Sequence, residues 1–173
     1  MRLLLVCGSL MAGSVNEAAL RTATHVVPEG VETDLYRGLA ALPHFNPDHD
    51  HDPLPHGVAD LRARIALADA LLFCTPEYAG ALPGPFKNLL DWTVGGVEIG
   101  GKPTGWINVS TASTGALPAH DSLRRVLSYT GAKLVEEACA HLPLPRHLVG
   151  PDGLVTDPAF RRELALRLVA LTA

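Results

Sequence analysis

The fold is decided by the opening stretch of the chain, in which residues 2–16 are RLLLVCGSLMAGSVN. Arg2–Cys7 is an apolar run of strand length, and it stops at a Gly-Ser turn. An amphipathic helical pattern begins a few residues later, so the stretch predicts a strand, a tight hydroxyl-rich loop and a helix N-terminus. Backbone N–H groups and the positive end of the helix dipole converge at such a junction. We therefore expect an anion site here, most often one for phosphate.

Strand and helix patterns alternate along the rest of the chain. The predicted strands are Arg2–Cys7, Val31–Tyr36, Ala70–Cys74, Thr104–Val109 and Lys133–Val135, the last extending up to Ala138. The predicted helices are Ser14–Val26, Gly57–Ala68, Pro85–Trp92, Ala119–Thr130 and Pro158–Leu171. This alternation predicts an α/β protein whose parallel sheet is covered by helices on both faces.

The second predicted strand, Val31–Tyr36, alternates apolar and polar side chains as an edge strand does. This favours the strand order 2-1-3-4-5 of a flavodoxin-like three-layer sandwich, in a single domain over residues 1–173. In that order a ligand crevice lies at the carboxyl ends of strands one and three. The two unusual loops, residues 8–14 and 75–84, follow these same strands, so we expect them to form one site.

Composition excludes several classes of function. The formal net charge is -4 and no Lys/Arg cluster occurs, which argues against binding nucleic acid or an anionic membrane surface. No apolar run reaches the roughly 20 residues of a membrane span, and the first apolar block is too short for a secretory signal. Cys7, Cys74 and Cys139 are too dispersed for a disulfide framework. We therefore expect a cytoplasmic protein with reduced cysteines.

The first loop differs from three familiar phosphate loops. It lacks the spaced glycines of a dinucleotide-binding turn and the Lys of a Walker A loop. A phosphatase loop would need Arg six positions after Cys7, where Gly13 stands. What remains is a loop that holds a phosphate without cleaving it, through the side chains of Ser9, Ser14 and Asn16 and the amides of residues 11–15. The alternative is that Ser14 simply caps the helix.

The second loop contains Thr75-Pro-Glu-Tyr-Ala-Gly80 over the same predicted crevice. Pro76 and Gly80 fix an unusual backbone path, and Tyr78 offers a flat ring. Exposed peptide N–H groups on such a turn can bond the polar edge of a flavin. The alternative is a plain connecting turn.

At these residues the chain resembles the NAD(P)H-dependent FMN reductase family, which includes chromate- and quinone-reducing members. The resemblance lies in residues 8–20, 75–92 and 101–103. It implies a flavodoxin-like fold, FMN and NAD(P)H as cofactors, and a homodimer or homotetramer with the flavin near a subunit interface. It also implies that the first loop binds the FMN phosphate, the second lines the isoalloxazine, and the loop at 110–115 flanks the other ring edge. The implied cofactor-binding residues are Ser9, Met11, Ser14, Val15, Asn16, Pro76, Glu77, Tyr78, Ala79, Gly80, Ser110 and Thr111.

Two positions depart from the family pattern. Met11 stands where the family usually has an Arg that helps to hold the phosphate, and Ala79 stands where Asn is common. Loss of that Arg removes a charge-assisted bond worth about 1.5–3 kcal/mol in general.

The expected activity is hydride transfer from NADH or NADPH to FMN, followed by reduction of a flavin, quinone, azo compound or metal oxyanion in a ping-pong cycle. The flavin carries this chemistry, so no catalytic acid or base is predicted. One alternative is a flavodoxin-type electron carrier without pyridine-nucleotide turnover. Another is a scaffold that has lost flavin through the change at Met11.

Two further clusters have structural interpretations. Histidines and aspartates alternate over residues 44–56, but their spacing fits no closed structural metal site, so we predict a solvated loop and no metal. Lys87 and Asp91 stand one helical turn apart and are expected to pair. Trp92 is expected to be a core or subunit-contact residue.

Overall fold

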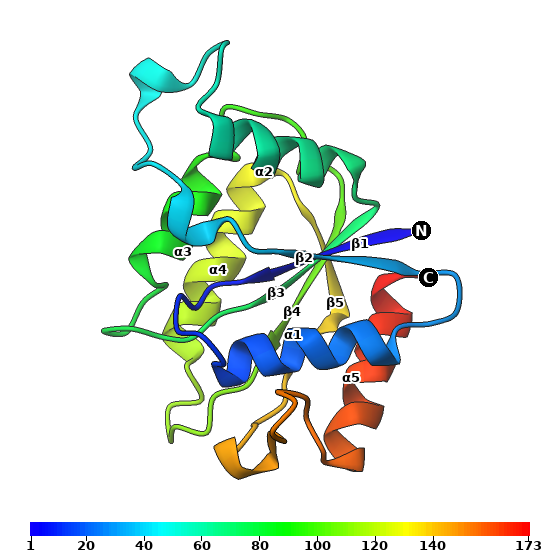
Figure 1. Ribbon diagram of the computed structural model, residues 1–173. Helices are drawn as coiled ribbons and strands as arrows, with labels where there is room; N and C mark the ends of the chain where they lie inside the picture. Colours follow the sequence, from blue (N-terminus) through cyan, green and yellow to red (C-terminus); the bar gives the residue numbers. More distant parts are fainter.

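A five-stranded parallel sheet in the order β2-β1-β3-β4-β5 forms the centre of the computed structural model, which describes residues 1–173 (Figure 1). The strands are β1 (Arg2–Cys7), β2 (Glu32–Tyr36), β3 (Ala70–Cys74), β4 (Pro103–Asn108) and β5 (Lys133–His141). Strand β2 is an edge strand, and the order reverses between β1 and β3. The predicted flavodoxin-like fold is confirmed, and the carboxyl ends of β1 and β3 lie side by side.

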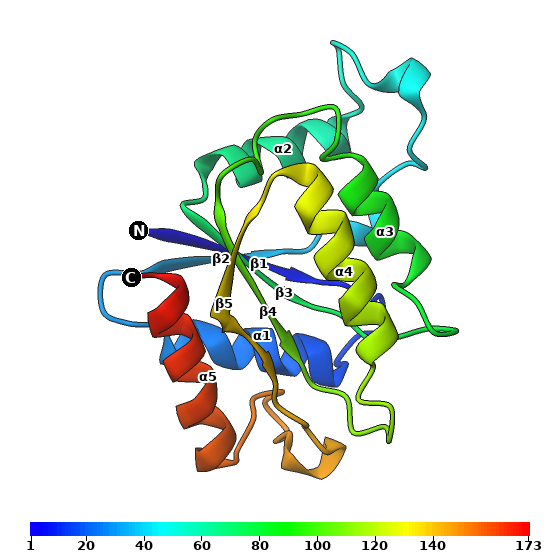
Figure 2. The ribbon, with the colours of Figure 1, turned by 180° about the vertical axis from the view of Figure 1, so that it is seen from behind.

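Helices cover both faces of the sheet, as Figures 1 and 2 show from opposite sides. One face carries α1 (Val15–Val26) and α5 (Pro158–Leu171), and the other carries α2 (His56–Leu67), α3 (Gly84–Asp91) and α4 (Leu117–Thr130). Leu3 and Leu5 pack toward α1 and α5, whereas Leu4 and Val6 pack toward α2, α3 and α4. None of the helices is both long enough and apolar enough to cross a bilayer.

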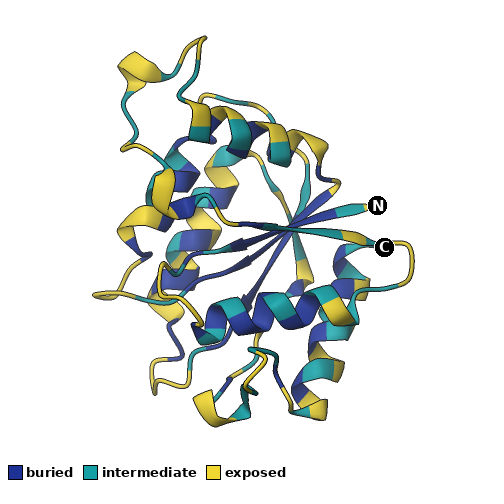
Figure 3. Ribbon diagram, in the orientation of Figure 1, coloured by how far each residue is buried: buried dark blue, intermediate teal, exposed yellow.

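Burial follows the helical spacing of apolar residues most closely in two helices, α2 and α5. The stripe of α2, which includes Val58, Leu61 and Ile65, is buried, and so is the stripe of α5 from Phe160 to Leu171. Figure 3 shows this inward-facing burial on the helices and the nearly continuous burial of the central strands. Apolar periodicity therefore predicts which helix faces form the core.

Strand β5 extends to His141, three residues beyond the furthest predicted end. Its register against β4 shifts between Thr104 and Trp106, where a side chain at Gly105 would lie 2.7 Å from the Cβ of Ala138. The bulged residues include Glu136, whose Oε2 accepts from Arg124 Nη2 at 2.9 Å. Exposed acidic residues interrupt the apolar pattern, which is why the sequence predicts too short a strand.

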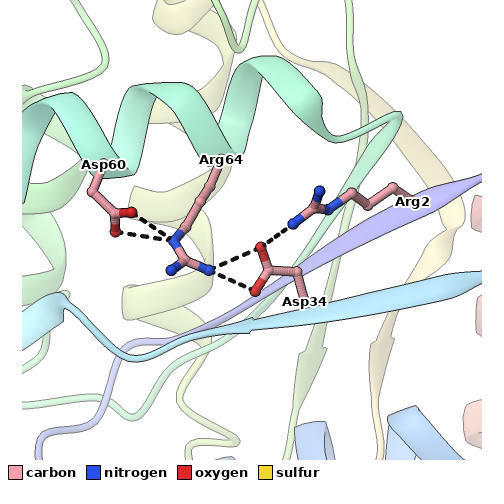
Figure 4. A network of polar contacts seen from close by, with 4 residues as sticks. All are labelled: Arg2, Asp34, Asp60 and Arg64. Carbon is pink, nitrogen blue, oxygen red and sulfur yellow. Dashed lines mark hydrogen bonds and ion pairs between the residues drawn. The ribbon is translucent and has the colours of Figure 1, made fainter.

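The edge strand β2 is fastened by a network around Asp34 (Figure 4). Its carboxylate accepts from Arg2 at 2.9 Å and from Arg64 of α2 at 2.8 and 3.0 Å. Arg64 also donates to Asp60 one turn earlier on the same helix, at 2.9 Å. Because Arg2 of β1 and Arg64 of α2 both donate to the Asp34 carboxylate, β2 is held against both β1 and α2.

The polar segment before α2 is anchored by Asp50, which pairs with Arg62 at 2.6 Å. Arg62 also donates to the backbone carbonyl of Trp92 at 2.8 and 3.0 Å, and only 9% of the residue is exposed. Lys87 pairs with Asp91 at 2.5 Å and Trp92 is fully buried, as predicted. These groups stabilise the fold around α3.

Candidate functional site

The first residues of α1 and the loops that follow β3 and β4 line a cavity of about 430 Å³ at the carboxyl edge of the sheet, and Leu144 and Arg146 complete its wall. This volume lies within the range of small-molecule and cofactor sites. Its wall includes half of the residues implied by the resemblance: Val15, Asn16, Pro76, Glu77, Ser110 and Thr111. The loops after strands one and three do lie side by side, since Gly8 N donates to Cys74 O, but residues 8–14 do not line this cavity as the sequence analysis expected.

The N-terminus of α1, just after the first loop, presents backbone donors to this cavity. Ser14 is the N-cap of α1: its hydroxyl oxygen accepts from Glu17 N at 3.1 Å, while a Glu17 oxygen accepts from Gly13 N at 2.9 Å. Ser14 is 1% exposed, so its side chain caps the helix, as the alternative interpretation proposed. The next two amides, of Val15 and Asn16, have no intrahelical acceptor, and both residues line the cavity. They are the free donors at the positive end of the helix dipole.

Gly8 allows the first two loops to come together. Its N–H donates to the carbonyl of Cys74 at 2.8 Å. A Cβ at this position would lie 2.2 Å from Thr75 Oγ1 and 3.0 Å from Phe86 Cγ, so only glycine fits. The wall of the cavity therefore depends on this close backbone approach.

The second loop is fixed at both ends. Glu77 accepts from the amide of Ala119 at 3.2 Å and so holds the loop against the first turn of α4. Beyond it, Tyr78 and Ala81 exchange two backbone hydrogen bonds of 3.0 Å around Ala79 and Gly80, which have φ values of +51° and +71°. Positive φ at both central positions defines a type I′ turn. Tyr78, Ala79 and Gly80 are exposed on this hairpin, adjoining the cavity without lining it.

The third loop is organised by Asn108, a buried residue that the sequence analysis did not single out. Its Nδ2 donates to Gly115 O at 2.6 Å and its Oδ1 accepts from Ser110 N at 3.0 Å. His141 Nε2 lies 2.8 Å from Ser110 O. A polar Asn at the end of an apolar strand was the available signal for this role.

Ser9 and Met11 lie elsewhere. They line a separate hollow of about 160 Å³, together with Tyr36 and Leu39 at the carboxyl end of β2. Ser9 Oγ accepts from the amide of Met11 at 3.2 Å, and the Met11 side chain is exposed. The structure therefore does not bring these two side chains to the larger cavity.

Arg146 lines the larger cavity from the segment between β5 and α5, where the sequence analysis predicts no strand or helix. Its guanidinium donates to the backbone carbonyl of Gly13 in the first loop. The contact joins residues far apart in the chain, so no spacing pattern could have indicated it.

The thiols near the site are protonated at neutral pH. Burial raises the pKa of Cys7 above its ordinary value of 9.0, and burial raises that of Cys74 well above it. The first loop thus holds no ready thiolate nucleophile. Its free amides, the guanidinium and the neighbouring hydroxyls suit the binding of a phosphate-bearing ligand.

These features define a flavodoxin-like α/β protein with a phosphate-compatible cavity at the topological switch point. The family model for NADPH-dependent FMN reductase matches residues 1–143, and the chain belongs to this family of oxidoreductases, which uses FMN and NAD(P)H. The predicted family is thereby confirmed.

Individual relatives agree with this membership. The chain is 31% identical over 168 residues to an NAD(P)H-dependent FMN reductase of Pseudomonas aeruginosa, covering 96% of this chain and 90% of that protein. It is 29% identical over 167 residues to a 2-hydroxy-1,4-benzoquinone reductase of Burkholderia sp, covering 95% and 90%. The solved structure of FerB, a flavoenzyme NAD(P)H:(acceptor) oxidoreductase from Paracoccus denitrificans, superposes with a TM-score of 0.86 at 29% identity, covering 98% and 94%.

Proposed function

We propose that this protein binds FMN in the 430 Å³ cavity and uses NADH or NADPH to reduce a small acceptor, with quinones as the first class to test. The observation that carries the proposal is the convergence of the N-terminus of α1 and the loops after β3 and β4 on one cavity in a member of an FMN reductase family. When bound, FMN accepts a hydride and passes electrons to an acceptor, so the protein's task is placement.

The residues present fit this cofactor. The free amides of Val15 and Asn16 suit its phosphate, because they lie at the positive end of α1. The pairs Pro76–Glu77 and Ser110–Thr111 suit the two sides of its ring system. Glu77 keeps the second loop in place through its bond to Ala119.

The other implied residues act indirectly in this proposal. Ser14 caps α1 and so orients the free amides. Ser9 shapes the first loop through its bond to Met11. The hairpin of Tyr78, Ala79 and Gly80 adjoins the cavity, where its exposed ring can contact an acceptor or a second subunit.

Quinone is the first acceptor to test because the Burkholderia relative is named a 2-hydroxy-1,4-benzoquinone reductase and an Escherichia coli relative a quinone reductase. Free flavin, azo compounds and metal oxyanions form the rest of the acceptor panel. The same cavity would serve each, since the electrons leave from the flavin.

The test is an anaerobic absorbance experiment on the purified protein with FMN. Addition of NADPH should bleach the visible flavin band, and a benzoquinone should restore it without any added reductase. A protein that binds FMN but is not bleached by NADH or NADPH would be an electron carrier of the flavodoxin type. A protein that takes up no FMN would refute the proposal.

We further propose a homo-oligomer, following the resemblance. Large apolar side chains are exposed on α4 and the segment after α3, including Val94, Val97, Leu117 and Tyr129. The backbone bond from Gly101 to Gly131 places the end of α4 beside that segment. Light scattering on the eluting protein should give a mass at least twice that of one chain, and a monomer would contradict this proposal.

A further inference from the structure

Arg146 occupies a position that the FMN proposal alone does not explain. It begins the short helix η3 (Arg146–Leu148), which lies in the segment coloured orange below α1 in Figure 1. Its guanidinium donates to the carbonyl of Gly13, next to the N-cap of α1. It lines the cavity together with Val15 and Asn16. A cation from the segment after the edge strand β5 thus reaches the loop that leads into the free amides of Val15 and Asn16.

This cation has no carboxylate partner, since none of the ion pairs in the structure involves Arg146. Glu17 of α1 accepts from Gly13 N and from Arg37, and Glu77, which lines the same cavity as Arg146, accepts from Ala119 N. Gly13 O takes one of the five N–H donors of a guanidinium, so the others remain available. The bond to Gly13 orients the group without neutralising it.

The first loop itself supplies no positive side chain, because residues 8–14 contain neither Lys nor Arg. Met11 lies in a separate hollow, away from the larger cavity. Any cationic contribution to anion binding at the start of α1 therefore has to come from outside the loop. Arg146 is the only Lys or Arg among the residues that line this cavity.

We propose that Arg146 is the cationic ligand of the FMN phosphate, delivered by the segment after β5 in place of a cation in the first loop. This proposal rests on the proposed function. A guanidinium beside two free amides offers a phosphate charge-assisted and bidentate hydrogen bonds. We assign Arg146 to the FMN phosphate and not to the 2′-phosphate of NADPH, because its guanidinium is bonded to the loop that precedes α1.

The test compares FMN with riboflavin, which has the same ring but lacks the phosphate. Arg146→Met should raise the Kd for FMN about 10- to 100-fold, because a charged hydrogen bond is lost. The Kd for riboflavin should change by less than about twofold, because no phosphate is present. Arg146→Lys keeps the charge but loses the planar fork, so its FMN affinity should lie between those of the other two proteins.

Arg162→Met is the matched control. Arg162 is exposed on α5 and lines none of the cavities described, so its removal changes the net charge equally. Its FMN affinity should equal that of the unaltered protein. Thermal unfolding of each variant, with riboflavin affinity as an internal check, shows that the fold is retained.

Three results would overturn the proposal: an unchanged FMN affinity in Arg146→Met, an equal loss for FMN and riboflavin, or an equal loss in Arg162→Met. A rise in KM for NADPH but not NADH, with FMN affinity intact, would assign Arg146 to the nucleotide and also overturn it. If the unaltered protein binds neither flavin, the proposed function fails together with this inference. If it binds FMN and only the Arg146 expectation fails, the proposed function stands.

Discussion

Substitution of Gly8 by Ala tests how the candidate site is assembled. Gly8 directly follows β1 and donates to the carbonyl of Cys74, the last residue of β3. An alanine Cβ would lie 2.2 Å from Thr75 Oγ1 and 2.6 Å from Thr75 Cβ. Thr75 is buried, and on the other side the same Cβ would meet Phe86 Cγ at 3.0 Å. The new methyl group therefore clashes with Thr75 and also lies unusually close to Phe86, so it cannot be accommodated without moving one of them.

The magnitude follows from these distances. Ordinary contact between such atoms begins near 3.4 Å, so the two loops must separate by about 1 Å. Forcing a methyl group into a well-packed site costs about 1–3 kcal/mol of folding free energy. The displacement falls on the strand ends that lead to Val15 and to Pro76, so FMN affinity should drop by at least about tenfold as well.

Urea unfolding and FMN titration of Gly8→Ala measure both effects. Gly57→Ala of α2 is the matched control, because a Cβ at Gly57 meets only ordinary contacts, the nearest being Ala41 O at 3.5 Å. The control should match or slightly exceed the unaltered protein in stability and should bind FMN normally. Equal stability and equal FMN affinity in Gly8→Ala would refute the argument that this close approach builds the cavity.

Three further predictions concern the surroundings of the site. Ala79→Asn should stabilise the fold by about 0.5–1 kcal/mol in urea unfolding, because Asn tolerates a φ of +51° better than Ala; unchanged or lower stability would contradict this. Asp34→Asn should destabilise it by about 1–2 kcal/mol, because two guanidinium groups lose a shared carboxylate that is 14% exposed, whereas Asp60→Asn should cost under about 0.5 kcal/mol; equal costs would reject the ranking. Burial lowers the pKa of His120 below its ordinary 6.5, so the unfolded chain binds this proton more readily and the stability from this group is lost as the pH falls below about 6.5. His120→Phe should flatten the loss of unfolding free energy between about pH 7.5 and about pH 5.5, and an unchanged slope would contradict it.

Local patterns predicted the fold well because most helices and strands show, within their own sequence, the apolar spacing of their type. The apolar stripe of α5 needs only helical spacing, and its predicted bounds match the observed Pro158–Leu171. Strand β5 does not show the apolar pattern of a strand along its whole length, because Glu136 and Glu137 are exposed at a bulge opposite Gly105. The bulge depends on pairing with β4, which is invisible in the sequence of β5 alone.

The sequence predicted the site residues whose position follows from the order of the strands. It missed those brought in by contacts between distant segments of the chain. Topology places the first two loops together, so Asn16 and Pro76 share a cavity as expected. A motif alone does not say which way a side chain points, and Met11 faces a different hollow. Arg146 joins the site through one backbone carbonyl far away in the chain, which no spacing rule anticipates.

A crystal structure of the protein with FMN tests the central claim most directly. The phosphate should lie at the amides of Val15 and Asn16 beside Arg146, with the ring system between the loops that contain Pro76 and Ser110. FMN bound in the hollow lined by Ser9 and Tyr36, or on any surface away from the carboxyl edge of the sheet, would contradict the account.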